Sequence, residues 1–395
     1  MLSIEGFTMK TILPASVVLL ALASSGIACG SSTTAPNENT PEETEVFKAP
    51  ELGKGDHSDE SVSYTTIATA KLGGVDLPRD LAFNPMRPDE LWIVNNGDES
   101  VTIVKDASKD ERKPSYIRDV ASSHFMLYPT SLAFGTDETT FGIKGTFATC
   151  GESRNEFGTN EETGAGKDFT GPSLWSSDLS IFAKKDPIGL GSHLDMLHNT
   201  PLCMGIAHDS DNKYWVVGGL SGAIEMYDFG KDHDIGMDDH SDGQFFQYAK
   251  GQLKYEKGVP SHLVVHSGLV YAADTGNGRI VKLDPGGSTR GAAFRPKERM
   301  GTSVVMNGGT LSDVVPSDAG HLVKPSGLAI RNDILYVSDN DNSRISAFSL
   351  EGERLNYLDT GLPKGSLAGI AFGPDDKLYF VDILGNRVLR IDEKN

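Results

Sequence analysis

Short runs of alternating apolar and polar residues, separated by polar or glycine-rich turns, repeat along most of the chain. In the clearest copies an apolar strand and a polar turn come first, followed by a second strand that ends in Asp. A turn that contains Asn then leads to a third strand, which begins with Arg-Ile or Arg-Val. Clear copies begin at Val259, Lys324 and Gly365, and weaker ones at Leu77, Tyr128 and Pro201. Period-two alternation over such short runs predicts strands in small sheets, and the repeat predicts six similar units.

The most regular unit reads PSGLAI from Pro325 and continues as LYVSDNDNSRI to Ile345. This motif resembles the NHL repeat, specifically in the last three units and loosely in the first three. The resemblance implies an all-β, six-bladed β-propeller of the NHL/TolB-like kind over residues 62–395. The last unit has three strands and a spare strand spans Ser63–Leu72, so we expect this N-terminal strand to close the last blade and remove the open sheet edges.

The N-terminus has the pattern of an export signal. Lys10 precedes an apolar core from Ile12 to Ala23, which is too short to span a bilayer. The segment ending at Cys29 resembles a bacterial lipobox, so we expect a signal peptide over residues 1–28 and lipidation of Cys29, with ordinary signal cleavage as the alternative. Residues 29–61 are poor in large apolar side chains and are expected to form a disordered acidic tether. The expected location is the bacterial cell envelope, either lipid-anchored to the outer membrane or periplasmic or extracellular.

The charge and the cysteine count of the chain limit its partners and its possible disulfides. The formal net charge is −19, which argues against nucleic acid because phosphate binding needs clustered Lys and Arg. If Cys29 is lipidated, Cys150 and Cys203 are the remaining cysteines, and either a disulfide or two free thiols fits the sequence. Membrane contact is expected only through the N-terminal lipid, and the protein is expected to be a monomer.

Histidines are concentrated between His193 and His266, where seven of the chain's ten lie. Imidazole beside carboxylate is the ligand set of transition-metal sites. These ligands favour a divalent transition metal, namely zinc, iron, manganese or copper, with calcium as a weaker candidate. A polar acidic surface with ordinary histidines remains the alternative interpretation.

The propeller frame divides the candidate metal ligands into two groups at opposite ends of the blades. The top face is the end at which the first strand of each blade begins, and the turns between first and second strands mark the bottom face. We expect His193, His198 and His262 near the top of the channel, with His262 replacing the glycine of its repeat and Arg79 as a candidate catalytic residue. The expected bottom group contains His208, His233, Asp239 and His240.

Two functional classes fit this frame. The first is a binding protein that takes a small molecule, peptide or glycan at the channel mouth, with a structural metal. The second is a metal-dependent lyase or hydrolase with imidazoles around an open metal position. The chain is similar in principle to peptidylglycine-amidating lyases, which are NHL-type propellers, but its histidines do not match their pattern residue for residue. We therefore transfer no catalytic residue from them.

A long insertion at residues 151–175 is a candidate lid, with Arg154 and Trp175 expected beside the channel mouth.

Overall fold

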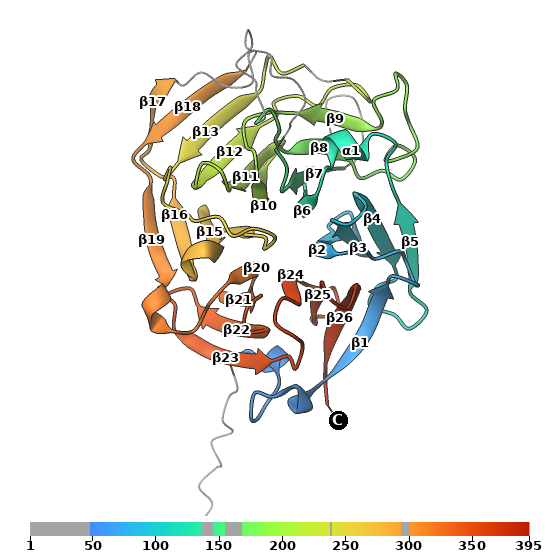
Figure 1. Ribbon diagram of the computed structural model, residues 1–395, viewed down its shortest axis with the longest axis vertical. Coiled ribbons are helices and arrows are strands. Elements are labelled where there is room, and N and C mark those ends of the chain that lie inside the picture. The colour runs from blue at the N-terminus through green and yellow to red at the C-terminus, as the bar shows by residue number, and fades with distance from the viewer. Residues whose placement is uncertain are drawn as a thin grey trace, which may run out of the picture. The chain divides into compact units, whose positions relative to one another are not determined.

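The computed structural model describes residues 48–135, 137, 145–154, 168–237, 239–293 and 301–394. In this part of the chain six small antiparallel sheets stand in a ring around a central channel (Figure 1). The first strand of each sheet faces the channel, and the later strands lie progressively outward. The expected signal segment and the candidate lipidation site Cys29 lie outside the described residues. None of the helices in the described part of the chain is long and apolar enough to cross a membrane.

The blades follow one another in chain order. Blade 1 contains β2 (Pro78–Asn84), β3 (Arg87–Asn95), β4 (Ser100–Lys105) and β5 (Lys113–Ile117), and blade 2 contains β6 (Pro129–Phe134), β7 (Thr146–Gly151), β8 (Ser173–Ser176) and β9 (His193–Met196). Blade 3 contains β10 (Cys203–Ser210), β11 (Lys213–Gly218), β12 (Ala223–Asp228) and β13 (Gln244–Tyr248), and blade 4 contains β14 (Leu263–His266), β15 (Leu269–Asp274), β16 (Arg279–Asp284) and β19 (Thr310–Val315). Blade 5 contains β20 (Pro325–Arg331), β21 (Ile334–Asp339), β22 (Arg344–Ser349) and β23 (Arg354–Asp359).

Blade 6 joins the two ends of the folded unit. It contains β24 (Leu367–Phe372), β25 (Leu378–Asp382), β26 (Arg387–Glu393) and, as its outer strand, β1 (Val62–Thr69). β1 pairs antiparallel with β26, with Tyr64 opposite Ile391. The expected closure of the last blade by an N-terminal strand is therefore confirmed.

The chain before β1 is part of the fold from residue 48 onward. Short 3-10 helices lie at η1 (Pro50–Leu52) and η2 (Asp59–Ser61). Leu52 is fully buried among side chains of blades 5 and 6, and Asn356 donates from Nδ2 to the carbonyl oxygens of Ala49 and Gly53 at 3.0 and 3.1 Å. The expectation of a disordered tether up to residue 61 is therefore wrong for residues 48–61, because Leu52 provides the apolar contact that the rest of the segment lacks.

A hairpin that the repeat did not predict extends blade 3. Its two strands, β17 (Thr289–Ala293) and β18 (Thr302–Asn307), lie in the sequence between β16 and β19 of blade 4. β18 pairs in parallel with β13 of blade 3. The hairpin covers the outer edge of that blade, and an exposed strand edge is a site for unwanted pairing. The remaining short helices are α1 (Ser122–Phe125), η3 (Thr275–Asn277) and η4 (Ser317–Ala319).

Apolar side chains fill the spaces between neighbouring blades. Between blades 1 and 2, Trp92, Phe147 and Trp175 form an aromatic cluster in which all three side chains are fully buried. Trp175 therefore belongs to the inter-blade core, and its expected position beside the channel mouth is wrong. Trp175 lies on β8, the third strand of blade 2, and its ring packs among side chains of blades 1 and 2 in this cluster.

In two of the three clear repeats the Asp that ends the second strand pairs with the Arg that opens the third. Asp274 accepts from Nε of Arg279 at 2.7 Å, and Asp382 accepts from Nε of Arg387 at 2.7 Å. In blade 5 the corresponding Arg344 donates from Nε to Asp359 at 2.7 Å, and Asp339 accepts from the backbone N–H groups of Val323 and Lys324. The recurring Asp and Arg therefore fasten turns and strand ends within their own blades.

Candidate ligand-binding site

A cavity of about 430 Å³ occupies the centre of the ring and is lined by the first strands of all six blades. Most of its wall is aliphatic or aromatic, with Phe134 and Phe372 among the lining residues. The polar side chains lining it are Asp80, His208 and His262. The channel is therefore an apolar space with few polar groups.

Asp80 and His262 occupy the repeat position that is glycine in three other blades. At those positions the first strands approach closely: a Cβ on Gly205 would lie 2.0 Å from the carbonyl oxygen of Ser261, and one on Gly327 would lie 2.2 Å from that of Ala368. A residue with a Cβ fits at this position only where the neighbouring strands lie farther apart, and Asp80 and His262 both line the channel. Aligning the repeats was the sequence signal that would have identified Asp80 together with His262.

His262 connects three blades across the channel. Its Nδ1 lies 3.6 Å from Oδ1 of Asp80, and its Nε2 lies 3.2 Å from the carbonyl oxygen of Thr130. Asp80 also accepts from the backbone N–H groups of Leu81 at 2.8 Å and Leu132 at 3.1 Å. Burial raises the pKa of the Asp80 carboxyl, against the opposite effect of His262 and these N–H groups. The buried contacts of Asp80 and His262 thus connect blades 1, 2 and 4.

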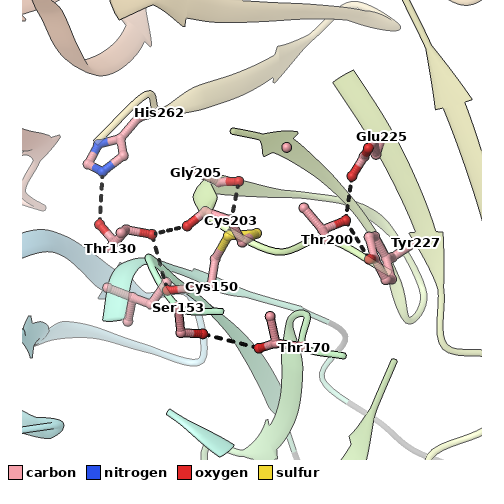
Figure 2. Close-up of a disulfide and its surroundings, with 12 residues drawn as sticks. Thr130, Cys150, Ser153, Thr170, Thr200, Cys203, Gly205, Glu225, Tyr227 and His262 are labelled. Carbon is pink, nitrogen blue, oxygen red and sulfur yellow. Dashed lines mark hydrogen bonds between the residues drawn. A yellow bond between two sulfur atoms is a disulfide. The ribbon is translucent and has the colours of Figure 1, made fainter. Parts of the chain in front are cut away.

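A disulfide lies next to this connection (Figure 2). Cys150 at the end of β7 and Cys203 at the start of β10 are bonded, with their Cα atoms 5.3 Å apart. The Thr130 hydroxyl lies 3.1 Å from the carbonyl oxygen of Cys150 and 2.8 Å from that of Cys203. The disulfide and Thr130 together join the top ends of blades 2 and 3.

A second cavity, of about 540 Å³, opens beside the disulfide on the top face. Its lining includes the apolar side chains of Tyr128, Phe169, Met196 and Leu202. It also includes hydrogen-bonding and charged residues from helix α1 and from both ends of the blade 2 insertion, namely Ser123, His124, Glu152, Ser153, Arg154 and Thr170. Its size and its mixture of apolar surface with a few polar groups are typical of small-molecule sites. We call it the top pocket.

Glu152 links the top pocket to the channel mouth. Its Oε1 accepts from the Tyr255 hydroxyl and from the Gly258 N–H, the latter at 2.9 Å. Arg79 donates to the carbonyl oxygen of the same Gly258 at 2.8 Å. Burial lowers the pKa of the Arg79 guanidinium, and the Glu152 carboxylate acts in the opposite direction. The candidate catalytic residue Arg79 is thus a half-buried cation held beside a carboxylate.

The two ends of the blade 2 insertion are tied together at the pocket. Arg154 and Asp168 form an ion pair with a nitrogen–oxygen distance of 2.5 Å, and the hydroxyls of Ser153 and Thr170 lie 3.1 Å apart. Residues 155–167, the centre of the candidate lid, lie outside the described residues. Arg154 lines the top pocket as an exposed side chain.

The structure regroups the candidate metal ligands. His233 and His240, expected at the bottom with His208, both lie 3.7 Å from Asp195 on β9 of blade 2. The ring of His198, expected at the top, lies 5.1 Å from the ring of His240. The expected division into these two groups is therefore wrong. The loop after β12 explains this: at residues 229–243 it is long enough to reach the neighbouring blade, where His233 N–H bonds to the Leu194 carbonyl.

The other candidate ligands lie apart from one another. His193 is fully buried, stacks on Phe125 at 3.6 Å and lies 2.9 Å from the carbonyl oxygen of Leu190. Nε2 of His208 lies 2.8 Å from the carbonyl oxygen of Asp211. Asp239 is exposed and accepts from the N–H of Ser241 at 3.1 Å. Within the described residues, no group of three or more His, Cys, Asp or Glu side chains is arranged so that it could hold a metal ion. Sequence reasoning overlooked Asp195, because a lone Asp in a short strand carries no signal of its own.

Comparisons with known proteins agree on the fold. No protein-family model matches the chain, and no curated protein matches it. A putative phosphatase from Bacteroides thetaiotaomicron has a TM-score of 0.54 at 10% identity, covering 85% of this chain and 79% of that one. A structural-genomics protein of unknown function from the same organism has a TM-score of 0.52 at 9% identity, covering 84% and 76%.

An auxiliary nutrient binding protein from Bacteroides thetaiotaomicron is also similar, with a TM-score of 0.50 at 11% identity over 87% of this chain and 75% of that one. Similarity at these identities identifies a fold and leaves ligand and reaction open, since one fold hosts many functions. The chain is a six-bladed β-propeller.

Proposed function

We propose that this protein is a cell-envelope binding protein of the NHL-repeat type, which takes a small molecule, short peptide or glycan fragment in the top pocket. The observation that carries the proposal is the pocket itself, whose lining combines aromatic and aliphatic side chains with Glu152 and Arg154 around a volume of about 540 Å³. Such a site holds an amphipathic ligand, with the apolar wall providing affinity and the charged wall fixing orientation.

The cell-envelope part of the proposal rests on the export signal, the lipobox-like segment at Cys29 and the disulfide. Disulfides persist in oxidising compartments, and the bond between Cys150 and Cys203 fits export. The NHL assignment rests on the motif from Pro325 to Ile345. The auxiliary nutrient binding protein of the same fold guides the choice of small, nutrient-like probes.

Binding has stronger support than metal-dependent lyase or hydrolase activity. The enzyme would need imidazoles around an open metal position at the channel mouth. His262 instead contacts Asp80 and Thr130 inside the channel, whereas the ring of His198 stacks on Phe169 at 3.8 Å. These two imidazoles therefore serve different parts of the molecule.

The proposal is tested by calorimetric titration with two probe panels, di- and tripeptides and oligosaccharides of two to four sugars. We expect at least one probe to bind, and Phe169→Ala and Glu152→Gln each to weaken its binding about tenfold, which corresponds to about 1.4 kcal/mol. Glu351→Gln, a surface change in the turn between β22 and β23, is the matched control and should bind as the wild type does. Absence of binding in both panels, or binding that neither pocket variant weakens, would contradict the proposal.

A further inference from the structure

The central channel is a second cavity, separate from the top pocket, because the two share no lining residue. Its lining runs from Asp80 and His262, near the starts of the first strands, to Phe134 and Phe372, which end β6 and β24. The strand β2 ends at Asn84, four residues beyond Asp80, which is about 13 Å of extended chain. The channel is therefore a mostly apolar space of about 430 Å³ with a carboxyl and an imidazole at its upper end.

The imidazole of His262 turns a hydrogen-bond acceptor toward Asp80. Its Nε2 lies 3.2 Å from the carbonyl oxygen of Thr130 (Figure 2), and because a carbonyl oxygen only accepts, this nitrogen carries a hydrogen. In the neutral ring Nδ1 is then an acceptor. It lies 3.6 Å from Oδ1 of Asp80, which is too long for a hydrogen bond. With a neutral ring, these two acceptors are joined only by a donor that lies between them.

The backbone holds the Asp80 carboxyl in this place. Its oxygens accept from the N–H groups of Leu81 and Leu132, and a Cβ on Gly369 would lie 2.4 Å from Oδ1, so glycine leaves the space that the carboxyl fills. Oδ1 accepts one of these bonds and has a second lone pair for another donor. The equivalent position of blade 2 is Ser131, whose buried hydroxyl has no hydrogen-bond partner among the described residues. This level of the ring is thus short of hydrogen-bond partners.

The charges around the channel favour a cation. Neither Lys nor Arg is among the described residues that line it. Arg79, next to Asp80 in the chain, donates instead to the Gly258 carbonyl oxygen beside Glu152. Burial raises the pKa of the Asp80 carboxyl, and a positive charge within reach offsets that cost. The net charge of −19 also attracts cations to the protein.

We propose that the channel binds a small apolar molecule with a primary ammonium group, whose nitrogen lies between Asp80 and His262. An ammonium group has three N–H donors and so satisfies both acceptors at once. The apolar body of the ligand lies along the aliphatic wall toward Phe134 and Phe372, where burial of apolar surface provides affinity. This site is independent of the ligand proposed for the top pocket, since it uses a different cavity.

The direct test is calorimetric titration of the wild-type protein with 2-phenylethylammonium. We expect a Kd of about 1 mM or tighter, which a probe of this size can reach. The neutral 2-phenylethanol has nearly the same shape and should bind at least tenfold more weakly, and phenylacetate should not bind. A wild type that does not bind the amine overturns the proposal and indicates a protonated His262 paired with Asp80. Equal affinity for the alcohol would overturn the role of the ammonium group.

Variants locate the amine. Asp80→Asn keeps the shape of the side chain, removes its charge and should weaken binding at least tenfold, whereas Glu351→Gln is the matched surface control and should bind as the wild type does. Glu152→Gln distinguishes the two cavities. Loss of amine binding in Glu152→Gln with none in Asp80→Asn would place the amine in the top pocket and overturn the proposal.

A second channel variant keeps the test decisive if Asp80→Asn does not fold, as judged by circular dichroism. Ala329→Leu leaves the polar pair intact and adds volume to the channel wall. It should weaken binding of the amine at least tenfold, because the larger side chain occupies the space of the apolar body. Amine binding that Ala329→Leu leaves unchanged would show that the ligand does not lie in the channel.

Discussion

At the residue scale, buried carboxyl groups hold neighbouring blades together at the cost of desolvation. Asp80 meets His262 inside the channel, whereas Glu225 on β12 is fully buried and surrounded by neutral donors. Its Oε1 accepts from Ser221 at 2.6 Å and from Gln247 at 2.9 Å, and Thr200 donates to its other oxygen (Figure 2). Burial raises the pKa of Glu225 in spite of these bonds.

This raised pKa predicts a pH dependence of stability. Because the pKa of Glu225 is higher in the folded than in the unfolded chain, the folded state binds more protons between the two values. The free energy of unfolding therefore falls as pH rises through that window. Glu225→Gln removes the titrating group and should lose less stability than the wild type as the pH rises from about 4.5, the ordinary pKa of a glutamate carboxyl, through the raised pKa of Glu225. Urea unfolding across this range checks the prediction, and the exposed Glu351→Gln serves as control. Parallel profiles for wild type and Glu225→Gln would contradict it.

At the element scale, strong local connections join blades 2 and 3. The disulfide links β7 to β10 across 53 positions of the chain, and the loop after β12 pairs with β9 through the Gly236 N–H and the His193 carbonyl at 2.8 Å. The top pocket lies along this junction. Rigid connections here keep the walls of a pocket built from several elements in place.

Removing the disulfide should therefore lower the free energy of unfolding substantially. The double variant Cys150→Ala, Cys203→Ala is expected to lose about 4 kcal/mol of unfolding free energy, because the unfolded chain regains the freedom that the cross-link removed. Urea unfolding measures the loss, and a reducing agent should destabilise the wild type while leaving the double variant unchanged. Equal stability of the two proteins under oxidising conditions would show that the cross-link contributes nothing.

At the scale of the whole molecule, the ring is closed by two segments from before blade 1. β1 supplies the outer strand of blade 6, and Leu52 packs against blades 5 and 6. Closure removes the exposed edge of β26, so the ends of the folded unit stabilise each other.

Truncation separates these contributions. Removing residues 1–47 should leave the unfolding transition unchanged, and removing residues 1–61 should lower the free energy of unfolding by about 2–5 kcal/mol, as expected for losing a buried Leu. Removing residues 1–70 should expose the edge of β26 and abolish a single cooperative transition. Thermal unfolding followed by circular dichroism distinguishes the three. A 1–70 deletion that unfolds like the full chain would contradict the role assigned to β1.

The sequence alone predicted six similar units, because period-two alternation and a repeated strand order are local properties that each unit displays. The resemblance of the clear units to the NHL repeat implied that these units are the blades of a propeller, and the spare strand before the first unit implied its closure by β1. It missed the contribution of residues 48–61, since one buried Leu in a polar segment carries no periodic signal. The hairpin of β17 and β18 was missed for a related reason: its pairing partner is β13, in the neighbouring blade.

The candidate sites depended on the tertiary structure. The propeller frame placed His198 and His240 at opposite ends of the blades, whereas their rings lie 5.1 Å apart. The frame predicts where a strand begins and ends, but not how a long loop crosses to the next blade. The sequence by itself determined the architecture, because repeated short-range patterns specify the blades. Only the tertiary structure decided that Asp195 meets His233, because that contact depends on the path of one loop over a neighbouring sheet.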